Sequence, residues 1–107
     1  MGSYRPSSNG SQTFVFADLA GFTALTEAHG DGLAAELASS FCSRMRNVAR
    51  EHSSSVVKTI GDAVMIRCPQ PWEAVGLALH ILDDEHARTD FLGVRVGMNT
   101  GSAVERD

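Results

Sequence analysis

The chain has 107 residues, 43% of them hydrophobic, and a formal net charge of −4. This length suits one domain with one core, and the lack of a basic footprint argues against nucleic acid as a partner. No apolar run is long enough to span a bilayer. Its only cysteines, Cys42 and Cys68, and the absence of a signal-peptide pattern predict a reduced, cytoplasmic setting.

Strand-like and helix-like patterns follow an opening segment rich in Ser, Gly, Asn and Pro. Residues 1–12 are expected to be a disordered lead-in, and 13–107 one folded domain. Runs rich in β-branched residues predict strands at Thr13–Asp18, Ser55–Ile60, Ala63–Cys68 and Val94–Thr100. Apolar spacing predicts a long helix from Asp31 or Gly32 with the stripe Leu33, Leu37, Phe41, Met45 and Val48, and a second helix from Pro71 with the stripe Val75, Ala78, Leu79 and Leu82. Thr23 is expected to cap a short helical turn after the first strand.

The predicted order is β-α-β-β-α-β, which is the ferredoxin-like split arrangement of the α+β class. Right-handed crossovers then place the first strand between the third and the fourth, antiparallel to the third. The C-terminal end of the first strand therefore meets the N-terminal end of the third.

This topology brings Asp18 and Asp62 to one edge of the sheet. A carboxylate at the end of a buried strand is costly unless a cation compensates its desolvation. Paired carboxylates beside glycines favour metal ions and phosphate, as in phosphoryl or nucleotidyl transfer. The alternative interpretation makes Asp18 a helix cap and Asp62 a turn residue.

Other groups suited to a ligand are expected at the same edge. The segment Gly21-Phe22-Thr23 starts a helix, where free backbone N–H groups suit a phosphate, and the carbonyl of Leu19 can add a metal ligand. The four histidines do not form a metal-binding spacing and are interpreted as non-catalytic, with no inward partner expected for His80 or His86.

Three segments resemble the leading motifs of class III adenylyl/guanylyl cyclases of a bacterial, actinobacterial-like kind. They are Phe16–Thr23 (FADLAGFT), Lys58–Met65 (KTIGDAVM) and Val94–Gly101 (VRVGMNTG). The resemblance runs from about Thr13 to Gly101. It implies conversion of ATP to 3′,5′-cyclic AMP and pyrophosphate, for intracellular signalling.

The resemblance also implies residue roles. Asp18 and Asp62 match the aspartates that hold two Mg²⁺ or Mn²⁺ ions, and the carbonyl of Leu19 adds to the metal site. Gly21, Phe22, Thr23 and Gly61 match positions around the substrate phosphates. Lys58 matches the lysine that accepts adenine. A lysine donates to the N1 acceptor of adenine, whereas guanine carries a donor at N1, so ATP is favoured over GTP. The alternative for Lys58 is a solvated strand residue.

Cyclases of this class continue into a further helix and strands that carry a second base-selecting residue and an asparagine–arginine pair. The sequence ends at Asp107, before those elements. The parent family forms homodimers in which the metal aspartates of one subunit face the lysine and arginine of the other. Identical copies therefore cannot supply the missing groups, and this chain is expected to fold without turnover. The alternative is a catalytically inactive module that binds metal and nucleotide or regulates a full-length cyclase.

Overall fold

The computed structural model describes residues 11–88 and 93–102 of the chain. The strands are β1 (Ser11–Leu19), β2 (Ser55–Ile60), β3 (Ala63–Cys68) and β4 (Val94–Ser102), and the helices are α1 (Phe22–His29), α2 (Asp31–Glu51) and α3 (Pro71–His86). The strand β1 begins at Ser11, so the expected lead-in is shorter by two residues, and the rest of it lies outside the described residues. No helix in the described ranges is long and apolar enough to cross a membrane.

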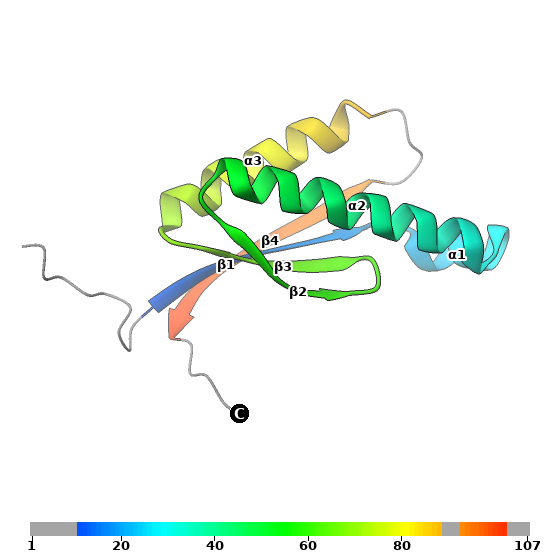
Figure 1. Ribbon diagram of the computed structural model, residues 1–107, viewed down its shortest axis with the longest axis horizontal. Helices are drawn as coiled ribbons and strands as arrows, with labels where there is room; N and C mark the ends of the chain where they lie inside the picture. Colours follow the sequence, from blue (N-terminus) through cyan, green and yellow to red (C-terminus); the bar gives the residue numbers. More distant parts are fainter. Residues whose placement is uncertain (1–10, 89–92, 103–107) are drawn as a thin grey trace, which may run out of the picture.

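The sheet confirms the predicted split β-α-β-β-α-β topology. Its strand order is β2-β3-β1-β4. This order places β1 between β3 and β4, and each pair of neighbouring strands is antiparallel. Figure 1 shows α2 and α3 side by side above one face of the sheet. This arrangement makes an α+β domain of two layers.

The core lies between the helices and this face of the sheet. Strand alternation points one side of β1 and β3 at α2 and α3. The largest fully buried side chains are Phe41, Met45, Ile66, Leu77, Ile81 and Val15. In α2 the predicted stripe is buried at its C-terminal half, whereas Leu33 is 37% exposed and Ala34 is buried beside it.

The buried face of α3 differs from the predicted one. The helix begins at Pro71 as expected, but it buries Ala74, Leu77, Ala78 and Ile81. Of the predicted stripe only Ala78 is buried, while Val75, Leu79 and Leu82 are exposed together with Trp72. Both stripes have helical spacing, so apolar spacing alone could not choose between them. The buried stripe contains two alanines, which let the helix lie close to the sheet.

Candidate active site

The strand register brings the two predicted aspartates to one edge of the sheet. Asp18 is the Cα partner of Ala63, and Asp62 directly precedes Ala63 in the turn between β2 and β3. Gly61 in that turn has a φ of 58°, a left-handed conformation that glycine adopts without the strain of a side chain. The predicted meeting of the ends of β1 and β3 is therefore confirmed.

Asp18 is paired with an arginine that the sequence analysis did not assign to the site. Arg95 lies opposite Asp18 on β4. Its Nε donates to Oδ1 at 3.1 Å and its Nη2 to Oδ2 at 3.3 Å. The side chains are 71% exposed for Arg95 and 34% exposed for Asp18. The register of β1 and β4 fixes which residue faces Asp18, and the predicted strand order left this register open.

Asp62 lies in a different environment from Asp18. It is half-buried. Burial raises the pKa of the Cys42 thiol on α2, and the Asp62 carboxylate raises that pKa further, while Arg46 lowers it. The charge of Asp62 therefore reaches the Cys42 thiol on α2. Asp62 forms no hydrogen bond or ion pair with another described residue, so its oxygens are available to a ligand.

The connection from β1 to α1 leaves backbone donors at the start of a helix. Gly21 is the N-cap, with φ 81° and ψ 10°, and no side chain caps this helix end. Thr23 is therefore not the cap that was predicted, because the helix already begins at Phe22. The Ala20 N–H donates to the Gly93 carbonyl at 2.8 Å and ties the loop to the residue before β4. First-turn N–H groups have no intrahelical acceptor and suit an anion.

The side chain of Phe22 has a structural place of its own. It is partly buried and packs against the hydrophobic core. Only its backbone N–H is then suited to a phosphate.

Lys58 lines an apolar pocket on the sheet face that faces away from α2 and α3. Lys58 pairs with Met65, and Met65 with Phe16, which precedes Asp18 by two residues. Residues that pair across strands share a face, and so do residues two positions apart on one strand. The side chains of Phe16, Met65 and Lys58 therefore start from the same side of the sheet as that of Asp18. The pocket has a volume of about 250 Å³ and is lined by Phe16, Lys58, Ile60, Ala63, Val64 and Met65. A flat aromatic ligand suits such a surface, with the ammonium group supplying polarity.

The oxygen donors at the sheet edge suit a hard divalent cation. Among the described residues no group of three or more His, Cys, Asp or Glu side chains could hold a metal ion. Two carboxylates and a backbone carbonyl are Mg²⁺- or Mn²⁺-type ligands, but Mg²⁺ is usually held by one or two carboxylates together with substrate phosphates. The residues therefore fit a cation that shares its coordination with a phosphate-bearing ligand, provided that Arg95 releases Asp18.

A family model for the adenylate and guanylate cyclase catalytic domain matches residues 5–106. The chain belongs to this family. It is 36% identical over 97 residues to the pH-sensitive adenylate cyclase MT1302 of Mycobacterium tuberculosis, covering 88% of this chain and 23% of that protein. The chain thus spans about a quarter of the length of this curated relative.

Solved structures share the fold at lower identity. A bacterial light-regulated adenylyl cyclase aligns with a TM-score of 0.79 at 22% identity, covering 90% of this chain and 56% of that one. The dimeric guanylyl cyclase domain of the RhoGC fusion protein from Blastocladiella emersonii aligns with a TM-score of 0.75 at 20% identity, covering 85% and 57%. These matches confirm the cyclase fold predicted from the three motifs.

Proposed function

We propose that this chain is part of the catalytic domain of an adenylyl cyclase, which converts ATP to 3′,5′-cyclic AMP and pyrophosphate in cytoplasmic signalling. The observation that carries the proposal is the register of β1 and β3, with Asp18 opposite Ala63 and Asp62 next to it. The uncapped start of α1 follows Asp18 by four residues, and we assign it to the same site. Carboxylates for cations and backbone N–H groups for phosphate are what a nucleoside triphosphate requires.

The proposed metal ligands are Asp18, Asp62 and the carbonyl of Leu19, holding two Mg²⁺ or Mn²⁺ ions. Cations bound there would neutralise the triphosphate and favour ionisation of the ribose 3′-hydroxyl. Asp18 must exchange its Arg95 partner for this role. The proposed phosphate contacts are the N–H groups of the segment from Gly21 to Thr23, with Gly61 giving the β2–β3 turn its shape.

The base is proposed to lie in the apolar pocket beside Lys58. Its wall of Phe16, Ile60 and Met65 can cover a purine face, and the Lys58 ammonium can donate to adenine N1. The fold does not decide between ATP and GTP, because the structural neighbours include both adenylyl and guanylyl cyclases. The donor chemistry of Lys58 supports ATP.

A homodimer of the complete domain is proposed to use the sheet face that carries this pocket. On that face Phe16 is 43% and Ile60 is 64% exposed. We further propose that the 107-residue chain alone does not turn over ATP. The alignment with the solved cyclase domains leaves over 40% of each of those chains unmatched, since 56% and 57% are covered.

A second candidate function is a non-catalytic module that binds metal and nucleotide or regulates a full-length cyclase. The observation that favours it is the Arg95–Asp18 pair, which occupies both oxygens of one proposed metal ligand. Formation of cyclic AMP by a version extended past Asp107 separates the two candidates, because the module would bind Mn²⁺ and ATP without producing it.

The binding experiment is a calorimetric titration of Mn²⁺ into the chain with and without ATP. Wild type should bind Mn²⁺ more tightly when ATP is present, and the double variant Asp18→Ala/Asp62→Ala should lose this binding. Asp83→Ala, at an exposed position of α3, is the matched control and should behave like wild type. Equal binding by wild type and the double variant would refute the proposed metal site.

A further inference from the structure

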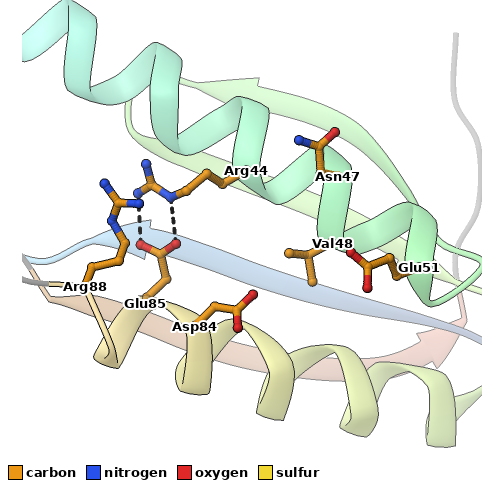
Figure 2. A pocket seen from close by; sticks show the side chains of 7 residues that line it. All are labelled: Arg44, Asn47, Val48, Glu51, Asp84, Glu85 and Arg88. Carbon is orange, nitrogen blue, oxygen red and sulfur yellow. Dashed lines mark hydrogen bonds and ion pairs between the residues drawn. The ribbon is translucent and has the colours of Figure 1, made fainter.

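The arginines of α2 lie on two different sides of the helix. Arg44 is turned toward α3, where its guanidinium donates to the two carboxylate oxygens of Glu85 at 2.8 and 2.9 Å. Figure 2 shows this pair across a cleft of about 370 Å³ between α2 and α3, which Glu51 also lines. Arg46 comes two residues after Arg44, which is more than half a helical turn, and Arg50 follows about one turn later. Arg46 and Arg50 therefore lie on the side of α2 that faces away from this cleft.

These two arginines line a second pocket, between the last turns of α2 and the beginning of β2. The pocket has a volume of about 190 Å³ and is lined by Arg46, Arg50, Ser54, Ser55 and Val56, none of which is acidic. Neither arginine forms an ion pair with another described residue, although Arg50 donates a hydrogen bond to Oδ1 of Asn47. Residues four apart are neighbours on a helix, so the two like charges repel each other. In a chain of net charge −4, this pocket thus gathers two positive charges without a counter-charge.

The turn between α2 and β2, which forms one wall of the pocket, is held by hydrogen bonds. Ser54 is buried, its N–H donates to the Ala49 carbonyl at 2.9 Å, and its hydroxyl donates to the His52 carbonyl at 2.9 Å. His52 is the C-cap residue of α2, and its Nε2 lies 2.9 Å from Nδ1 of His80 on α3. The expectation that His80 has no inward partner was therefore wrong. Because these contacts already fix the turn, a ligand in the pocket does not have to order it.

The donors in this pocket suit a phosphate group better than a carboxylate. Each guanidinium is a planar fork that can give two parallel N–H hydrogen bonds to one oxyanion. A tetrahedral phosphate has enough oxygens to accept from two such forks at once, whereas the two oxygens of a carboxylate are filled by one. A phosphate can also carry two negative charges, which matches the two positive charges of Arg46 and Arg50.

We propose that Arg46 and Arg50 form a binding site for a phosphate-bearing small molecule at the junction of α2 and β2. This site is separate from the candidate active site, because it lies where β2 begins, whereas Asp62 follows the end of that strand. A phosphate held there joins the last turns of α2 to the first residues of β2, the strand that carries Lys58. The inference uses none of the residues assigned to catalysis, so it stands or falls independently of the proposed function.

The direct test is an NMR titration of the wild-type chain with inorganic phosphate and with pyrophosphate, at constant ionic strength and with a chelator that removes divalent cations. The Nε–H signals of Arg46 and Arg50 and the backbone amide signals of Ser54 and Ser55 should shift along a saturating curve. Acetate should bind about tenfold or more weakly than phosphate, because it fills only one guanidinium fork. Shifts that grow linearly without saturation, or saturation confined to the amides around Gly21, would overturn the proposal.

Variants then separate a built site from a general effect of net charge. Arg46→Gln and Arg50→Gln should each raise the dissociation constant for phosphate about fivefold or more, and Arg46→Lys, which keeps the charge without the fork, should lie between wild type and Arg46→Gln.

The matched control for these variants is Arg67→Gln. Arg67 is exposed on β3 and follows the buried Ile66, so its side chain starts from the opposite face of the sheet. This variant should change the dissociation constant by less than about twofold, because an exposed charge outside the site is screened by salt. Urea unfolding verifies that all four variants are folded. Equal weakening by Arg67→Gln and Arg46→Gln would also overturn the proposal.

Discussion

Arg95 and Asp18 face each other across β4 and β1 and share two hydrogen bonds, at 3.1 and 3.3 Å. The pair joins the third motif of the chain to the first, so a proposed metal ligand carries its own cationic partner in the structure. A half-exposed carboxylate held in this way cannot coordinate a cation through the same lone pairs. The guanidinium must move before Asp18 can bind metal.

Replacing Arg95 should therefore ease metal binding in the absence of nucleotide. Arg95→Gln is expected to tighten Mn²⁺ binding by a few-fold, because an exposed ion pair contributes about 0.2–1 kcal/mol. The measurement is Mn²⁺ titration followed by water proton relaxation. Arg67→Gln, an exposed arginine of β3, is the matched control and should change little. Weaker Mn²⁺ binding by Arg95→Gln than by the control would contradict the competition.

The half-buried position of Asp62 can be tested through Cys42. Asp62→Asn removes a negative charge that raises the pKa of the Cys42 thiol, so that pKa should fall and the thiol should react faster with a maleimide at pH 8. Arg46→Gln removes a positive charge that lowers the pKa, so it should slow the reaction. Cys68→Ser as background isolates Cys42. A change of the same sign in both variants would contradict the proposed position of Asp62.

Base selection should depend on Lys58 in a version of the domain extended past Asp107. Lys58→Glu places a carboxylate acceptor opposite the N1 acceptor of adenine. This mismatch should lower kcat/KM for ATP relative to GTP by an amount equivalent to about 1–3 kcal/mol. Lys58→Met is the companion variant, which should weaken ATP use without a gain for GTP. An unchanged ratio of kcat/KM in Lys58→Glu would show that Lys58 does not contact the base.

The fold and the meeting of Asp18 with Asp62 could be predicted because they depend on local patterns and on one handedness rule. The strands are short β-branched runs between turn residues, and the right-handed crossover leaves a single strand order. The residue facing Asp18 needed the register of β4, which is fixed by pairing over the whole strand. Arg95 therefore emerged only from the structure.

The predictions from the sequence were wrong where the sequence allowed more than one local arrangement. In α3 apolar residues cover more than one face, and tertiary packing chose the face with small residues, Ala74 and Ala78. At α1 the left-handed Gly21 is the N-cap, so Thr23 lies within the first turn and does not cap the helix. The partner of His80 lies 28 residues away in sequence, and no periodicity connects it to His52.

The buried face of α3 can be tested with two leucines of the same helix. Leu77 is fully buried and Leu79 is 62% exposed. Leu77→Ala should lower the free energy of unfolding by about 2–5 kcal/mol, since it leaves a cavity in the core. Leu79→Ala should change it by less than about 1 kcal/mol. Urea unfolding measures both changes. A larger loss of unfolding free energy for Leu79→Ala than for Leu77→Ala would support the buried face predicted from spacing.

The final prediction is that the 107-residue chain folds but does not turn over ATP. It should fold because every element of the split β-α-β-β-α-β unit is present and α2 and α3 cover one face of the sheet. It should be inactive because, of the two cations assigned to the site, Arg95 is engaged with Asp18 and Lys58 is proposed to bind the base. Groups that stabilise charge on a transferring phosphate commonly contribute several kcal/mol.

Cyclic AMP formation from ATP and Mn²⁺ should be measured for the purified chain beside a version extended past Asp107. Circular dichroism and a cooperative urea transition establish that the shorter chain is folded. Raising its concentration should not produce activity, because identical copies lack the same groups. Robust turnover by the folded 107-residue chain would mean that transition-state charge is stabilised by residues already present, with Arg95 released from Asp18 as the first to examine.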